Sequence, residues 1–160
     1  MLVYHGSDMT IEKPLTSYSS SRLDFGKGFY VTSIKLQAER WAKRKASFNK
    51  NNKGIVNVYE YTIKSGFNIK DFVDNLDEWI DFVCACRAGE DIYKNFDIIK
   101  GLVANDKVFR VVDMYRRGFW DKDRTIHEMR VYPTYDQIVF ISQMALDSSL
   151  DFQYSYEVTL

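Results

Sequence analysis

The order of strand-like and helix-like segments is the feature that most constrains the fold of this chain. Segments rich in β-branched and aromatic residues, such as 55–63, alternate irregularly with segments whose apolar residues recur at helical spacing, such as 35–48. This irregular order suits an α+β fold better than a doubly wound parallel sheet. With 160 residues, of which 46% are apolar, the chain can bury the core of one domain spanning residues 1–160.

The segment that begins at Leu76 carries the clearest helical signal. Its apolar stripe follows the i, i+3, i+4, i+7, i+8 pattern and consists of Leu76, Trp79, Ile80, Val83 and Cys84. Asn75 and Glu78 stand at capping-box spacing at its start. The pattern therefore predicts an amphipathic helix that begins after Asn75.

The other segments give a provisional element list. We expect further helices at 35–48, 108–118 and 122–130 and a short one after Ser142. We expect strands at 2–5, 29–32, 55–63, 96–103, 137–141 and 152–160. The strand at 96–103 is predicted to be broken at Gly101, and polar residues 16–21 suit a long loop.

Charge and composition disfavour several classes of function. Lys+Arg and Asp+Glu each number 22, so the basic excess that is usual for a nucleic-acid binder is absent. The basic run at 40–45 leaves a local patch open, although the solvated face of a helix is the favoured interpretation. No secretory signal and no 18-residue apolar segment is visible, which predicts a soluble, cytoplasmic protein without a membrane partner.

The cysteines and histidines do not form a metal site in the sequence. Cys84 and Cys86 lie two residues apart in a predicted helix and so point to different faces, which predicts neither a disulfide nor a metal pair. The two histidines are far apart and show no metal-ligand spacing. We therefore expect no metal cofactor.

Several polar residues lie at positions where they could contact a ligand. His5 ends the first strand, Tyr30 follows the glycines at 26 and 28, and Gln137 enters a late strand. Each alone is compatible with a structural role, and the glycines match neither a GxxxxGK[ST] loop nor a GxGxxG motif. Their order along the chain is more informative than any one of them.

That order resembles the ADP-ribosyltransferases of the diphtheria-toxin and poly-ADP-ribose-polymerase type. The resemblance rests on Tyr-His-Gly-Ser at 4–7, Phe-Gly-Lys-Gly-Phe-Tyr-Val-Thr at 25–32 and a polar residue at 137. More closely, the whole chain resembles the bacterial DUF3990 family of uncharacterised proteins. The segments that carry this resemblance are 4–7, 24–30, 37–42, 57–59, 78–83, Arg87, 96–108 and 136–140.

The resemblance implies a fold and an NAD site. The implied fold is α+β, with split antiparallel sheets of the ADP-ribosyltransferase type and flanking helices. It implies that His5 bonds the adenosine ribose, that the backbone of Gly6 holds the nicotinamide carboxamide and that Tyr30 stacks on the nicotinamide ring. The implied cofactor-binding residues are His5, Gly6, Ser7, Gly28, Tyr30 and Thr32. Tyr30 and Gln137 are the implied catalytic residues, and NAD is the co-substrate.

Gln137 departs from the glutamate that active superfamily members commonly keep. A neutral amide can orient the ribose, but it cannot take a proton or offer a negative charge to an oxocarbenium-like transition state. Three alternatives stay open. The acceptor is already nucleophilic, another carboxylate substitutes, or the domain binds NAD without efficient transfer. The candidate carboxylates are Asp136, Asp106, Asp81 and Glu128.

The predicted function is therefore mono-ADP-ribosyl transfer from NAD to an unknown macromolecular acceptor. By analogy, we also expect a toxin role with an antitoxin partner. The alternatives are a non-catalytic NAD or nucleotide-binding module of the same fold and an NAD glycohydrolase. Arg87 can pair either with a pyrophosphate or with a carboxylate of the protein.

Overall fold

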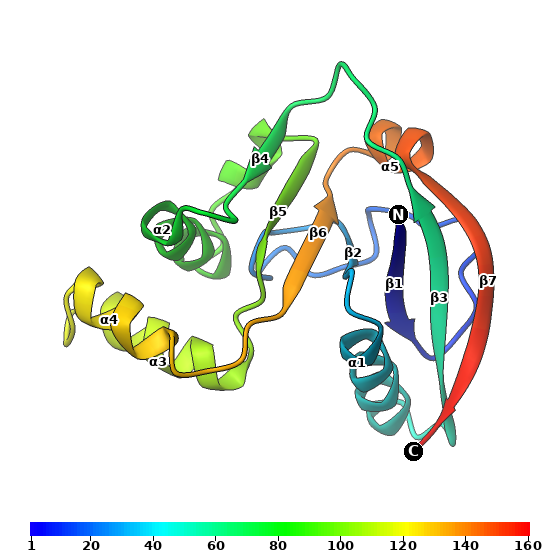
Figure 1. Cartoon of the computed structure of the whole chain (residues 1–160), viewed down its shortest axis with the longest axis horizontal. Coiled ribbons are helices and arrows are strands. Elements are labelled where there is room, and N and C mark those ends of the chain that lie inside the picture. The colour runs from blue at the N-terminus through cyan, green and yellow to red at the C-terminus, as the bar shows by residue number, and fades with distance from the viewer.

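Two β-sheets and five α-helices make up the structure, a computed structural model that describes residues 1–160 (Figure 1). The strands are β1 (Leu2–Ser7), β2 (Phe29–Val31), β3 (Lys53–Tyr61), β4 (Ile69–Asp71), β5 (Ile98–Leu102), β6 (Asp136–Phe140) and β7 (Leu150–Thr159). The helices are α1 (Lys35–Phe48), α2 (Leu76–Arg87), α3 (Asp106–Arg116), α4 (Lys122–Met129), α5 (Gln143–Ser149) and the 3₁₀ helix η1 (Ile92–Asn95). The α+β class predicted from the sequence is confirmed.

The two sheets differ in strand direction. The first has the order β1-β3-β7 and is antiparallel throughout, with His5 paired with Asn57 in the register of β1 and β3. The second has the order β2-β6-β5-β4, and its β4 runs parallel to β5. The expectation of antiparallel sheets is therefore wrong at β4. The sheets meet where Tyr4 of β1 bridges to Thr32, just after β2.

Side-chain caps fix the starts of four helices. Asn75 accepts a hydrogen bond from the Glu78 amide, as the capping-box spacing predicts, and Asn105 caps α3 in the same way. Asp121 and Ser142 cap α4 and α5. Helix α1 has no such cap of its own. Its start depends instead on contacts with residues from β6, which are described below.

Three apolar clusters hold the layers together. The largest lies between the four-stranded sheet and helices α2, α3 and α4, with Trp79 fully buried in it. The second fills the space between the two sheets and includes Val3, Phe29 and Tyr59. The third lies under α1, where Ala38 packs over the outer face of the three-stranded sheet. Small residues on α1 allow this close approach.

The structure corrects three details of the predicted elements. Strand β5 passes through Gly101 without a break. The glycine is needed for packing, because a Cβ there would lie 2.8 Å from the Phe25 ring. Strand β1 continues through Gly6 to Ser7 instead of ending at residue 5. The short strand β4 and the helix η1 were not predicted.

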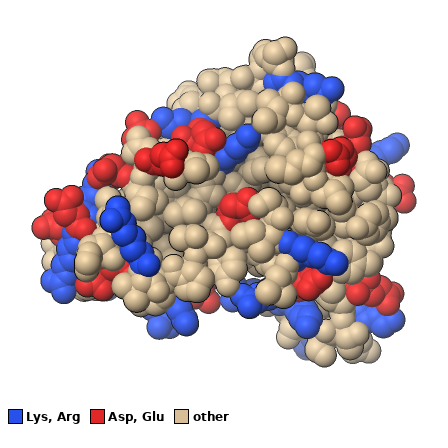
Figure 2. All heavy atoms as spheres, viewed as in Figure 1, with Lys and Arg blue, Asp and Glu red and all other residues tan.

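Helix hydrophobicity and surface charge indicate which kinds of partner the protein could bind. No helix has the length and apolar character needed to cross a membrane. In Figure 2, basic and acidic side chains are interspersed over the face in view, without a large area of one sign.

Candidate functional site

His5 and Tyr30 lie side by side although 25 residues separate them. The imidazole Nδ1 of His5 lies 2.6 Å from the backbone carbonyl oxygen of Tyr30, and the His5 ring stacks on Phe29 at 4.4 Å between centroids. A carbonyl oxygen can only accept, so Nδ1 must carry the proton. The carbonyl of Tyr30 therefore fixes both the orientation and the tautomer of His5.

The protonation state of His5 follows from its surroundings. Burial lowers the pKa of His5, Lys45 adds to this, and the hydrogen bond to Tyr30 opposes the shift. The ring is therefore neutral at pH 7. With Nδ1 as the donor, Nε2 is left as an acceptor, and no group of the protein donates to it. A half-buried imidazole of this kind is suited to bind a hydroxyl group.

The edge of β1 next to His5 is open at Gly6. Tyr4 directs its N–H and C=O towards Thr32, so Gly6, two residues further on, directs its own groups to the same side. Neither group of Gly6 has a partner there. A Cβ at this position would lie 2.2 Å from the Ala38 carbonyl oxygen, so only glycine allows α1 to cover it. The backbone N–H and C=O of Gly6 are therefore a free hydrogen-bond donor and a free acceptor on one residue.

The side chain of Tyr30 lies on the opposite face of the second sheet from Phe29, among the residues of the largest cluster. Its hydroxyl donates to the Gly26 carbonyl at 2.5 Å and accepts from the Phe25 amide at 3.2 Å. Burial and the nearby Asp24 carboxylate raise the pKa of the phenol well above its usual range. Tyr30 therefore meets His5 through its backbone, while its hydroxyl is neutral and bonded to the glycine turn.

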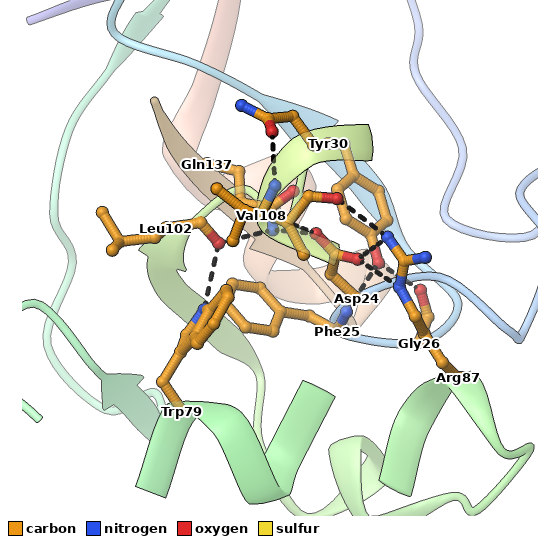
Figure 3. A network of polar contacts seen from close by, with 11 residues as sticks. Asp24, Phe25, Gly26, Tyr30, Trp79, Arg87, Leu102, Val108 and Gln137 are labelled. Atoms are coloured by element: carbon orange, nitrogen blue, oxygen red, sulfur yellow. Dashed lines mark hydrogen bonds and ion pairs between the residues drawn. The ribbon is translucent and has the colours of Figure 1, made fainter. Parts of the chain in front are cut away.

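Gln137 belongs to a buried polar network with Asp24 and Arg87 (Figure 3). Its Nε2 donates to Asp24 Oδ2 and to the Leu102 carbonyl, each at 3.0 Å. Arg87 binds Asp24 Oδ1 through Nε at 2.7 Å and Nη2 at 2.6 Å. The Ala104 amide donates to Asp24 Oδ2 at 2.8 Å. Of the two partners considered for Arg87, the structure therefore contains the carboxylate.

The four carboxylates considered as substitutes for a glutamate at position 137 make no hydrogen bond with Gln137. Desolvation acts to raise the pKa of Asp81, but the hydrogen bonds from Lys122 and Tyr115 and the charge of Lys122 together lower it. Asp106 is exposed and pairs with Arg44 at 3.4 Å. Asp136 and Glu128 are half-buried. The carboxylate that contacts Gln137 is Asp24, which the sequence did not single out.

Thr32, Gly28 and Ser7, which were also expected at the NAD site, contact other residues of the protein. Thr32 is buried, its hydroxyl donates to Asp136 Oδ1 at 2.6 Å, and it accepts from the Ile34 amide at the start of α1. Gly28 packs against β6, where a Cβ would lie 2.5 Å from a backbone oxygen. Ser7 is buried at the end of β1, and its hydroxyl donates weakly to Asp8 at 3.5 Å.

A pocket of about 250 Å³ lies between α1 and the residues next to Gln137. We call it the α1 pocket, and its walls are formed by Gln37, Arg40, Trp41, Arg44, Val103, Asn105 and Tyr135. Gln37 Nε2 donates to the Asp136 carbonyl at 3.0 Å, and Trp41 touches Gly6, where an added Cβ would lie 2.8 Å from its own. The α1 pocket therefore lies between the open edge of β1 and the start of β6.

Sequence reasoning missed Asp24, Gln37 and the position of Trp41 in the wall of the α1 pocket. Asp24 and Gln37 belong to segments that resemble the family, but neither has a spacing that identifies a polar cluster. Trp41 fits the apolar pattern of α1 and is only half-buried. No group of three or more His, Cys, Asp or Glu side chains in the structure could hold a metal ion.

Comparison with known sequences identifies the family. The sequence profile of DUF3990, described as a protein of unknown function, matches residues 1–152. The chain belongs to the DUF3990 family. No curated protein and no solved structure matches this DUF3990 chain significantly. The matched residues include the His5–Tyr30 contact, the Asp24 network and the α1 pocket.

Proposed function

We propose that the protein binds NAD at the junction of β1 and β2 and transfers its ADP-ribose to a macromolecular acceptor. The observation that carries this proposal is the neutral His5, whose Nε2 is free to accept while Nδ1 is fixed by Tyr30. The superfamily resemblance of residues 4–7 and 25–32 is the second support.

The free groups at this junction match the groups that NAD offers. His5 Nε2 can accept from a ribose hydroxyl. The free N–H and C=O of Gly6 can bind the two complementary groups of a carboxamide. Fixing both ends of the nicotinamide riboside holds the bond between them in one orientation, and orientation is a large part of the rate enhancement in such reactions.

The network around Gln137 limits how the acceptor is activated. The side-chain amide of Gln137 cannot take up a proton at pH 7, so it cannot act as a general base. The negative charge of the neighbouring Asp24 is neutralised by Arg87. We therefore infer that the acceptor is nucleophilic without losing a proton to position 137. This is the first of the three alternatives left open by the sequence.

The test is nicotinamide release from NAD by the purified protein, measured alone and with cell lysate. We expect release to need lysate, since the acceptor comes from it, and to be lost in His5→Ala. His127 is exposed and far from β1 in sequence, so His127→Ala is the matched control and should keep full release. Release by His5→Ala equal to that of the unchanged protein would refute the assignment.

A binding module without transfer is the second candidate. The observation that favours it is that the Tyr30 hydroxyl and the Gln137 amide both bond to the interior of the protein. In that case NAD raises the thermal stability of the protein, but nicotinamide is not released. Release that does not increase with lysate would instead indicate a glycohydrolase, with water as the acceptor.

A further inference from the structure

The α1 pocket carries positive charge that the protein does not neutralise. Arg44 pairs only with Asp106, at 3.4 Å. Because both side chains are largely exposed, this ion pair is weak and leaves most of the positive charge of Arg44 uncompensated. Arg40 donates to the Tyr135 hydroxyl at 2.6 Å and has no carboxylate partner. The nearby Asp136 carboxylate is bonded to Thr32 and to Ser33. Two guanidinium groups therefore face the pocket, and guanidinium groups bind phosphate oxygens in pairs.

Gln37, a residue of the pocket wall, has a buried acceptor without a donor. Gln37 is 3% exposed and lines the pocket, and its Oε1 has no hydrogen-bond partner. The orientation of this amide is fixed, because Nε2 must donate to the Asp136 carbonyl. A buried oxygen without a donor is unfavourable, so a ligand N–H group that reaches it would recover free energy. The Asn105 side-chain amide donates to no group of the protein and can bind the ligand as well.

Two aromatic rings and Val103 complete the walls of the α1 pocket. Trp41 lines the pocket from α1, and Tyr135 lines it from the segment just before β6. The Arg40 guanidinium lies 5.8 Å from the centre of the Tyr135 ring. Aromatic side chains beside arginines are typical of sites that stack nucleobases. The volume of about 250 Å³ is below the range of about 300–1,000 Å³ for drug-sized ligands, so it suits one nucleotide unit and not a whole dinucleotide.

We propose that the α1 pocket binds a nucleoside phosphate, which is the acceptor of the ADP-ribose. Arg40 and Arg44 hold the phosphate, Trp41 stacks on the base, and Gln37 Oε1 accepts from a base N–H. The ligand is either the terminal nucleotide of a strand, which is a macromolecular acceptor, or a free nucleotide, which would replace the macromolecule in the proposed function. Binding in the pocket stands by itself, whereas its role as acceptor rests on the proposed function.

A phosphate acceptor needs no general base. The second pKa of a phosphate monoester is about 6, so at pH 7 most of it carries two negative charges. A phosphate oxygen forms the bond to C1′ of the nicotinamide ribose, and the C1′–N bond breaks. Its electron pair neutralises the pyridinium nitrogen, so nicotinamide leaves uncharged and no proton is transferred. This agrees with an amide at Gln137, one residue from Asp136, to which the pocket residue Gln37 is bonded.

The first experiment is calorimetric titration of the full chain with AMP, GMP, CMP and UMP, with the corresponding nucleosides and with a 5′-phosphorylated oligonucleotide. We expect at least one nucleotide to bind and its nucleoside to bind at least about tenfold more weakly. Arg40→Gln and Arg44→Gln should each weaken binding by about tenfold or more. Lys43 is exposed on the same helix and does not line the pocket, so Lys43→Gln is the matched control.

Three results would overturn the proposal. They are no binding of any nucleotide, an equal loss of affinity in Lys43→Gln, or displacement of the nucleotide by NAD. Tighter binding of the oligonucleotide than of AMP identifies a strand end as the source. Arg40 and Arg44 are exposed, so their variants should unfold like the unchanged protein, and thermal unfolding checks this.

The second experiment adds NAD and tests the bound nucleotide for resistance to phosphatase. A transferred ADP-ribose blocks the phosphate, so resistance should appear together with nicotinamide release. If nucleotides bind in an Arg40-dependent manner but no nicotinamide is released with any acceptor, the proposed function fails and the binding site stands. If lysate supports release but phosphatase still removes the phosphate, the acceptor assignment fails alone.

Discussion

Replacing Gln137 by glutamate tests the account of the buried network most directly. The glutamine Nε2 lies 3.0 Å from both Asp24 Oδ2 and the Leu102 carbonyl oxygen. A carboxylate there would put two anions in contact at a position that is 3% exposed. The new side chain should therefore take up a proton, which lets it donate to Asp24 in place of the amide.

The cost of that proton sets the magnitude. Keeping a glutamate protonated costs about 1.4 kcal/mol for each pH unit above its ordinary pKa of about 4.3. In Gln137→Glu, this is about 1 kcal/mol at pH 5 and about 4 kcal/mol at pH 7. Because the folded-state pKa is raised, the loss of stability is small near pH 4 and grows as the pH rises.

The assay is urea unfolding at pH 5, 6, 7 and 8 for the unchanged protein and Gln137→Glu. The free energy of unfolding of the variant should fall by about 3 kcal/mol more than that of the unchanged protein between pH 5 and pH 7. Gln153 is exposed on β7, so Gln153→Glu is the control and should show no such difference. A Gln137→Glu variant as stable as the unchanged protein at pH 8 would refute the reasoning.

Three further predictions concern His5, Gly6 and Asn75. Because the pKa of His5 is lowered, its contribution to stability is complete above about pH 6.5 and is lost as the pH falls below it; unfolding between pH 5 and 7 should show this slope, and His5→Asn should reduce it. Gly6→Ala should destabilise the protein by about 1–3 kcal/mol, because the added Cβ lies 2.2 Å from the Ala38 carbonyl oxygen; an unchanged melting temperature would contradict this packing. Asn75→Ala should cost about 1 kcal/mol through loss of the α2 cap, measured by urea unfolding, and no loss would show that the cap contributes nothing.

The sequence predicts those parts of the fold that depend on local patterns. Periodicity predicts α1 over 35–48, and capping chemistry predicts the start of α2 at Leu76. The three-residue strand β4 has no apolar alternation of its own, and it forms by pairing with β5, which follows almost thirty residues later. Pairing between distant segments leaves no local signal, so β4 and its parallel direction could not be predicted.

The same division applies to the candidate site. His5 and Tyr30 could be selected from short motifs, and their contact depends on the bridge between Tyr4 and Thr32. Asp24 and Arg87 are 63 residues apart in the sequence, and they meet where Phe82 of α2 packs against Phe25, the residue after Asp24. Neither periodicity nor spacing connects such residues. The polar network that surrounds Gln137 therefore becomes visible only in three dimensions.

The amide at Gln137 can be understood as the partner of Asp24. The Asp24 carboxylate receives one guanidinium, the Ala104 amide and the Gln137 amide, so only donors surround it. If a carboxylate at 137 is excluded by the charge of Asp24, neutralising Asp24 should make it tolerable. Asp24→Asn combined with Gln137→Glu keeps one negative charge beside Arg87 and offers an amide donor towards position 137.

A double-mutant cycle tests this coupling. The two single variants should each be destabilised, and the double variant should be more stable than their sum by about 2 kcal/mol, within the range for residues of one network. Urea unfolding at pH 7 measures all four proteins. Additive losses would mean that Asp24 does not determine the residue at 137. A stabilised double variant would carry a carboxylate at position 137, so under the proposed function its nicotinamide release would show whether the amide limits transfer.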